Sequence, residues 1–139
     1  MSGMNEAQAL ARPSSSTNNA AFIAAHVTDA RFALLRVLGV DIVSPLARAL
    51  DGAKSIDDLT EMPLRSDVED AWTLAARALR DRLETITAEE LAAQSSTTLP
   101  LLDKSVLAVA TFLVHHDTYH VGQLSLLRKY VGLPAMAYT

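Results

Sequence analysis

Three long segments of the chain repeat apolar residues every three or four positions, the period of an amphipathic α-helix. The spacing predicts helices over residues 19–38, 66–86 and 103–131, with shorter helices at 45–50 and 87–94. No stretch of useful length alternates apolar and polar residues as a half-buried strand does. The pattern therefore predicts an all-α fold, most simply an antiparallel helical bundle.

The ends of these segments carry residues that commonly begin or stop helices. The stretches Ser66–Glu69 and Thr87–Glu90 both have the capping-box pattern, in which a hydroxyl and a glutamate three residues later satisfy the first backbone amides. Gly39 and Gly132 follow the last apolar positions of the first and third long helices, where glycine often ends a helix. The predicted boundaries thus rest on local chemistry as well as on periodicity.

The length of 139 residues is typical of one domain with a single core. We expect one helical-bundle domain over residues 1–139, in which residues 1–17 are weakly ordered or form a short helix. Met4–Arg12 could form that helix, since Pro13 would end it and a polar loop follows.

Composition narrows the possible partners and chemistry. Half of the residues are apolar and the formal net charge is -4, so no basic excess is available to neutralise nucleic acid. The chain has no cysteine, which excludes thiolate metal sites and cysteine nucleophiles. The densest apolar run, residues 106–114, is shorter than the roughly 20 residues needed to cross a bilayer, and no export signal is visible. We expect a cytoplasmic protein with neither nucleic-acid nor membrane partners.

Three of the four histidines occupy stripe positions where a core residue is expected. His26 interrupts the stripe of the first long helix, while His116 and His120 stand four apart on one face of the third. An unpaired buried polar group costs on the order of 1–3 kcal/mol. A divalent ion would satisfy all three rings and keep one coordination position open, as catalytic zinc sites do. The pattern favours a metal site, and hydrogen-bonded core or surface histidines are the other interpretation.

Three neighbouring residues are candidates for supporting roles. Gln123, three residues after His120, can orient a ligand imidazole or bond a neighbouring helix. Asp29, three residues after His26, can accept a hydrogen bond from that ring, or it is a solvated surface carboxylate. His115 is expected to be a partly buried interface histidine, with a substrate-facing acid/base role as the alternative.

The sequence also predicts the surroundings of three further residues, namely Asp117, Gly122 and Trp72. Asp117 points off the apolar stripe, so we expect it to face solvent or to cap a helix end. Gly122 costs roughly 1 kcal/mol relative to alanine in mid-helix, which a close helix–helix approach would explain. Trp72 lies on the predicted apolar stripe of the second long helix and is expected in the core.

Two segments carry a resemblance to a known family. The sequence HDTYHVGQLSLLRKYVGLP, residues 116–134, resembles the DinB/YfiT-like superfamily, whose recurrent signature is a His-x-x-x-His-x-Gly-Gln helix followed by Leu and Arg positions and Gly-Leu-Pro. The stretch NNAAFIAAH, residues 18–26, is similar to that family's helix carrying a third histidine. The resemblance covers most of the chain from about residue 12 onward.

The resemblance implies a four-helix bundle with a divalent metal held by three histidines, which by position are His26, His116 and His120. Zinc suits three imidazoles best, although nickel and iron(II) also accept them. The family includes bacillithiol transferases and mycothiol-dependent maleylpyruvate isomerases. It therefore implies a metal-dependent transferase or hydrolase with a small-molecule substrate and a low-molecular-weight thiol as a further cofactor. The alternative is a non-catalytic binding or dimerisation module whose metal, if present, is structural.

The chain departs from the family at its N-terminal end. The family has a full-length helix before the loop corresponding to Pro13–Asn19, whereas only about a dozen residues precede that loop here. The first helix is therefore expected to be short or missing. Either another subunit completes the bundle or the metal-facing cleft is more open. We expect a homodimer, since dimerisation is common in the family.

Overall fold

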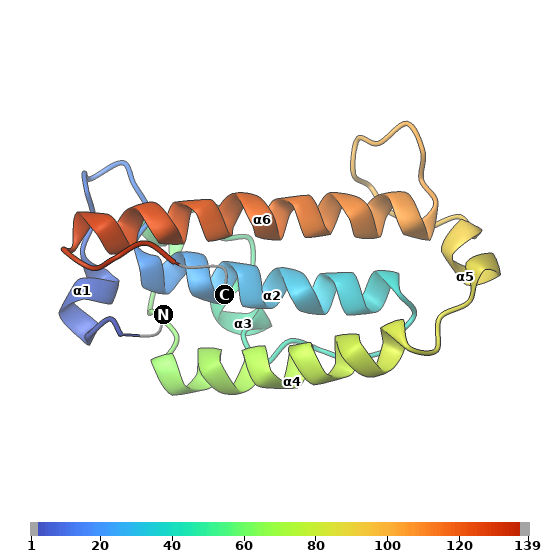
Figure 1. The fold of residues 1–139 in the computed structure, drawn as a ribbon, viewed down its shortest axis with the longest axis horizontal. Helices are drawn as coiled ribbons and strands as arrows, with labels where there is room; N and C mark the ends of the chain where they lie inside the picture. Colours follow the sequence, from blue (N-terminus) through green and yellow to red (C-terminus); the bar gives the residue numbers. More distant parts are fainter. Residues whose placement is uncertain (1–2, 137–139) are drawn as a thin grey trace.

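Three long helices form the body of the molecule, for which a computed structural model describes residues 3–136. They are α2 (Ala20–Val37), α4 (Arg65–Leu83) and α6 (Val106–Tyr130). Helix α2 lies between the other two and packs against both (Figure 1). Helices α2 and α4 run in the same direction and α6 runs in the opposite one (Figure 1). No strand forms among the described residues, so the predicted all-α helical bundle is confirmed.

Four short helical pieces complete the described chain. They are α1 (Glu6–Leu10), α3 (Ala47–Leu50), the 3₁₀ helix η1 (Ile56–Asp58) and α5 (Ala88–Ala92). Helix α1 is the short helix expected near the N-terminus, and Asn5 caps it. Helix α3 is a single turn, shorter than predicted. The long helices therefore carry the packing that positions any site.

The helix ends largely follow the predicted capping chemistry. The backbone amide of Glu90 donates to the Thr87 hydroxyl, and the Glu90 carboxylate accepts from the Thr87 amide, as a capping box requires. Gly39 and Gly132 have φ values of 82° and 80°, in the left-handed region that ends helices. These three boundaries are confirmed.

The capping box predicted at Ser66 is wrong. Helix α4 begins one residue earlier, at Arg65, and its N-cap Leu64 supplies no side-chain hydrogen bond. The Glu69 carboxylate, which the prediction assigned to the cap, instead accepts a hydrogen bond from Nε of Arg65 at 2.7 Å. Arg65 lies one turn before Glu69 and binds its carboxylate, so this carboxylate does not cap the helix.

Helix α2 forms the centre of the core. Phe22, Val27, Phe32 and Leu35 all expose 2% of their surface or less. This burial follows from the position of α2 between α4 and α6, since both of its flanks are covered. Its histidine is therefore presented to α6 from a well-packed helix.

Helix α6 is apolar around much of its circumference but is covered mainly along one side. Val109 and Leu127 are its buried residues, while Phe112, Val114 and Leu126 are exposed by 37%, 53% and 66%. A helix that is apolar all round is usually enclosed by neighbours. The predicted homodimer would cover such surface, and it stays a prediction.

The expected core position of Trp72 is wrong. Its side chain is 38% exposed, and the Arg31 guanidinium lies 3.6 Å from the centre of its ring. Helix α4 turns Val68, Ala71 and Ala75 toward α2 instead. These smaller residues occupy the buried positions of α4, and the large indole lies at the edge of the interface.

The close helix–helix approach expected at Gly122 is also absent. A β-carbon built at this position meets no atom within 4 Å among the described residues, and Gly122 is exposed. Packing among residues 3–136 therefore gives no reason for a glycine in the middle of α6.

The described helices include none that is both long and apolar enough to cross a membrane.

Candidate metal centre

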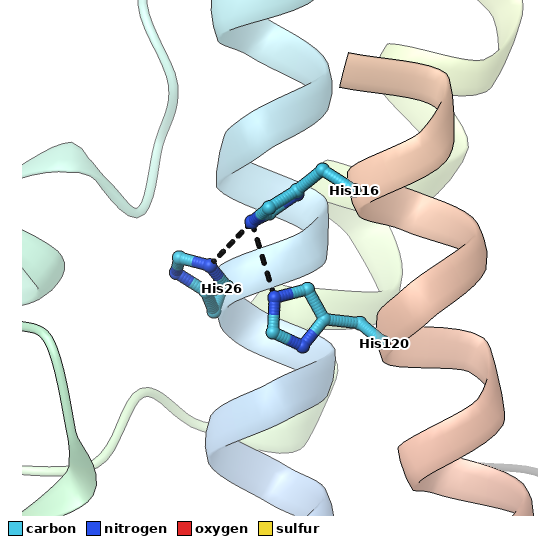
Figure 2. Close-up of side chains that lie close together, drawn as sticks. All are labelled: His26, His116 and His120. Atoms are coloured by element: carbon cyan, nitrogen blue, oxygen red, sulfur yellow. Dashed lines mark hydrogen bonds between the residues drawn. The ribbon is translucent and has the colours of Figure 1, made fainter. Parts of the chain in front are cut away.

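The imidazoles of His26, His116 and His120 turn toward one another at the contact between α2 and α6 (Figure 2). Nε2 of His116 lies 3.1 Å from Nε2 of His26 and 3.1 Å from Nε2 of His120. One nitrogen from each ring lies within 4.8 Å of the other two. The structure thus brings together the three histidines that the sequence singled out.

The two helices present these rings for simple geometric reasons. His116 and His120 are four residues apart, so they project from adjacent turns of one face of α6. On α2, the ring of Phe22 stacks on the ring of His26 with centroids 6.0 Å apart and an angle of 7° between planes. This stacking holds the His26 imidazole toward the other two rings.

The protein alone cannot satisfy the nitrogens of His116. An imidazole nitrogen offers one in-plane proton or one lone pair, so Nε2 of His116 cannot form two good hydrogen bonds with its two neighbours. Nδ1 of the same ring is buried and has no hydrogen-bond partner among the described residues. An orphaned polar atom of this kind costs about 1–3 kcal/mol.

The two nitrogen–nitrogen contacts at His116 fit a divalent ion. Nitrogens held 2.0–2.1 Å from a tetrahedral zinc are about 3.3 Å from one another, close to the two contacts at His116. Three imidazoles are a donor set that zinc, nickel and iron(II) accept. His26, His116 and His120 are therefore the residues that could hold a metal.

Gln123 orients His120 from behind. Its Oε1 lies 2.7 Å from Nδ1 of His120, and its Nε2 donates to the Tyr119 hydroxyl at 3.0 Å. Because an amide oxygen only accepts, Nδ1 of His120 carries the proton and Nε2 keeps its lone pair for the cluster. This is the support that metal-binding histidines usually receive, and it is one of the two roles predicted for Gln123.

Two of the three rings are harder to protonate than a free histidine. Burial, together with the neighbouring His120 and His116, lowers the pKa of His26 to about 4. Burial and His120 also lower the pKa of His116. Neutral imidazoles are the form that binds metal ions, so the site needs no deprotonation of these two rings at pH 7.

The metal-free protein should lose stability in acid because of His26. Its pKa is about 6.5 when unfolded and about 4 when folded. Between these values the unfolded chain binds more protons, so stability falls as the pH drops from 6.5 to 4. After allowance for solvent screening, we expect a loss of about 2 kcal/mol. Urea unfolding of chelator-treated protein at several pH values measures it.

The matched control is His26→Leu, which removes the titrating ring. In this variant, the free energy of unfolding should change less between about pH 6.5 and pH 4. Identical profiles for the variant and the original protein would contradict the assignment to His26.

Two of the other candidates are less closely connected to the cluster. Asp29 is half-buried, and its charge only opposes the lowering of the His26 pKa that burial causes. Within the described residues, the His26 ring has a hydrogen bond to His116 and none to Asp29. His115 is exposed in the single chain, so its burial at an interface would need a partner and stays a prediction. Its side chain leaves α6 about 100° away from His116, off the face that carries the cluster.

The expected solvent or capping role of Asp117 is wrong. Its carboxylate accepts a hydrogen bond from Nε of Arg31 at 3.0 Å, and both side chains are only about one fifth exposed (22% for Arg31 and 19% for Asp117). The guanidinium also covers Trp72, so one arginine of α2 contacts both α4 and α6. Asp117 directly follows His116 in sequence, and its ion pair with Arg31 links α6 to α2.

Sequence reasoning missed Arg31 and Tyr119. Arg31 stands between the buried Thr28 and Leu34 on α2, and a charged residue at the edge of an apolar face signals a partner. Tyr119 precedes Gln123 by four residues, the spacing at which two side chains of a helix meet. Both signals were present in the sequence.

A separate groove is lined by other residues of the three long helices. A groove of about 600 Å³ runs between α4 and α6 over α2, and the histidines are not among its lining residues. Two of its polar groups are already engaged, since Glu69 pairs with Arg65 and the Thr28 hydroxyl donates to the Ala24 carbonyl. The histidine cluster, by contrast, brings together three groups that can bind one ligand.

Comparison with known proteins agrees with this geometry. The family model described as the DinB superfamily matches residues 1–124, a span that contains the three histidines and Gln123. The chain matched neither a curated protein nor a solved structure. With nearly all of its length covered by the family model, the chain belongs to the DinB superfamily.

Proposed function

We propose that this protein is a divalent-metal-dependent enzyme that activates a low-molecular-weight thiol for transfer to an electrophilic small molecule. The observation that carries the proposal is the grouping of three imidazole nitrogens within 4.8 Å of one another between α2 and α6, with contacts of 3.1 Å at His116. His26, His116 and His120 are the proposed ligands, and zinc is the metal that suits them best.

The charge of the site supports a thiol. A divalent ion bound by three neutral imidazoles keeps its full charge and an open position, where it can ionise a water or thiol and polarise a substrate. The two carboxylates nearest in sequence do not reduce that charge directly. Asp117 is paired with Arg31, and Asp29 forms no hydrogen bond with the His26 ring. An anionic partner such as a thiolate is therefore favoured. The thiol-dependent members of the family give independent support.

The chain's own residues have defined tasks in this proposal. His26 is held by the Phe22 ring, and His120 is held by Gln123, so two of the three ligands are oriented before a metal arrives. The low pKa of His26 keeps this ring unprotonated at neutral pH. Pre-organised neutral ligands reduce the cost of assembling the site.

Cobalt(II) and a thiol test the proposal directly. We expect stoichiometric cobalt to give visible bands, and an added thiol to produce a sulfur-to-cobalt charge-transfer band at saturation. The chain contains no cysteine, so such a band can arise only from the added thiol. The S-methylated form of the same thiol is the matched control and should give no band.

A cobalt spectrum that thiols leave unchanged would contradict the enzyme proposal. It would favour a non-catalytic module in which the metal only joins α2 to α6. The exposed apolar residues of α6, such as Leu126 at 66% exposure, favour an interaction surface in that case. The homodimer, proposed here on the same surface, is consistent with either function.

A further inference from the structure

One face of α6 is open to solvent and carries no charged side chain. Its residues follow one another at intervals of three and four, which keeps them on one side of the helix. We call this face the α6 seam, and it consists of Phe112, His115, Tyr119, Gly122, Leu126 and Tyr130, all of them exposed. Its four large side chains are exposed by between 37% and 66%. A stripe of this spacing is typical of a helix face that a second helix covers.

Gly122 lies in the middle of the seam. Glycine is a poor helix former, so its place in the centre of a long helix calls for a reason. A β-carbon built at Gly122 meets no atom within 4 Å among the described residues. A glycine on an exposed apolar stripe allows another backbone to approach closely. The space above Gly122 is therefore suited to a helix from outside this chain.

A second copy of the chain fits the seam. The seam has no charge that would repel its own copy, and a two-fold dimer brings the same patch of both chains together. If the two α6 helices run antiparallel and cross at Gly122, Tyr119 and Leu126 pack on either side of the crossing. This direction also keeps the basic last turns, which carry Arg128 and Lys129, away from each other.

The area of the seam meets the lower limit for a specific dimer. A buried aromatic side chain covers about 150–250 Å², so at the observed exposures the four large side chains offer roughly 500 Å² per copy. Two copies then bury about 1,000 Å² in total, the least that a specific interface needs. We expect a dimer of modest affinity that dissociates on dilution.

We propose that two copies of this chain pack antiparallel through the α6 seam and cross at Gly122. The contact supplies the partner that burial of His115 requires. It also adjoins the candidate metal centre, because the ring of Tyr119 meets the ring of His120 with centroids 5.1 Å apart. The second copy thus limits access to the histidine cluster from this side.

Gly122→Leu separates the dimer from the fold. Leucine is the better helix former and meets open space in the single chain, so the variant should be at least as resistant to heat when monomeric. In the dimer its side chain pushes the two helices apart. Sedimentation of the original chain at about 200 µM should show a dimer, and the variant should raise the dissociation constant at least tenfold.

Leu126→Glu tests the same face with a charge. The carboxylate is solvated in the monomer but enters the dimer twice, so this variant should also be monomeric. Val114→Glu is the matched control, since Val114 is another exposed apolar residue of α6 (53%) that lies about 120° around the helix from Leu126. The control should dimerise like the original chain.

A single cysteine tests the crossing point. The chain has no cysteine of its own, so a disulfide in Gly122→Cys can only join two copies. Its α-carbons must come within about 7 Å of each other, which the crossing at Gly122 provides. Diamide should therefore link Gly122→Cys into dimers. In Val114→Cys, eight residues from the crossing, the two cysteines are on the order of 24 Å apart and should stay unlinked.

The inference is overturned if the original chain is monomeric at about 200 µM, the concentration at which a modest interface should be occupied. A monomer that sediments with phosphatidylcholine vesicles would assign the seam to a membrane surface instead. Dimers that survive both seam variants, or that Val114→Glu also dissociates, overturn it as well. None of these measurements involves a metal, so their outcome is separate from that of the cobalt experiment.

Discussion

Alanine at position 26, 116 or 120 is expected to abolish stoichiometric binding of a divalent metal. If three imidazoles share an apparent binding free energy of roughly 10 kcal/mol, the loss of one costs about 3 kcal/mol, or more than a hundredfold in affinity. Elemental analysis of each purified variant, followed by competition with a chelator of known affinity, measures the effect. His115→Ala is the matched control, since this exposed neighbour of His116 should leave metal content unchanged.

Equal loss of metal in the His115 variant would contradict the assignment of the ligand face. A second measurement separates metal ligands from ordinary core histidines. His116 has one orphaned nitrogen and one that is shared between two contacts. In metal-free protein, His116→Leu should therefore preserve or increase stability. A loss of several kcal/mol would instead indicate that the His116 ring is satisfied by the protein.

Breaking the Arg31–Asp117 pair should have the largest effect on stability. Asp117→Ala leaves a guanidinium without its partner in a site that is only about one fifth exposed (22%). Removing one member of a buried pair costs about 3–5 kcal/mol, and with partial solvent access we expect about 2–3 kcal/mol. Chemical unfolding of the metal-free protein measures the change.

The Arg31–Asp117 pair is expected to contribute less to the free energy of unfolding than the cost of Asp117→Ala suggests. Burial raises the pKa of Asp117, and the nearby Arg31 offsets only part of the desolvation. The double variant Arg31→Met/Asp117→Leu should thus be more stable than Asp117→Ala, because methionine still packs on Trp72 and no charge is left buried.

Glu69→Ala is the surface control for this experiment. It breaks the Arg65–Glu69 pair, whose side chains are 41% and 56% exposed, and should cost no more than about 0.5 kcal/mol. A comparable cost for Asp117→Ala would contradict the proposed role of the buried pair.

Local patterns were most informative where one helix contains all the relevant groups. The spacing of His116 and His120 places them on one face of α6 whatever surrounds that helix. The same holds for Gln123, one turn beyond His120, and for the Thr87 capping box. Periodicity also placed α2 and α6 within a few residues of their observed ends.

Errors arose where the outcome depends on a second helix. Trp72 lies on an apolar stripe, but smaller residues of α4 occupy the buried positions, and the indole lies at the edge against Arg31 of α2. Asp117 points off the stripe of α6, yet α2 offers it the side chain of Arg31. The sequence of one helix does not reveal which charges a neighbour brings.

For this protein, local sequence was enough to establish the helical fold and to single out the three histidines, because each of them interrupts the apolar repeat of its own helix. Packing of α6 on α2 set the distance from His26 to the other two rings, the burial that keeps His26 neutral, and the pairing of Arg31 with Asp117. These properties join residues about 90 positions apart along the chain, so they depend on how the helices meet in space.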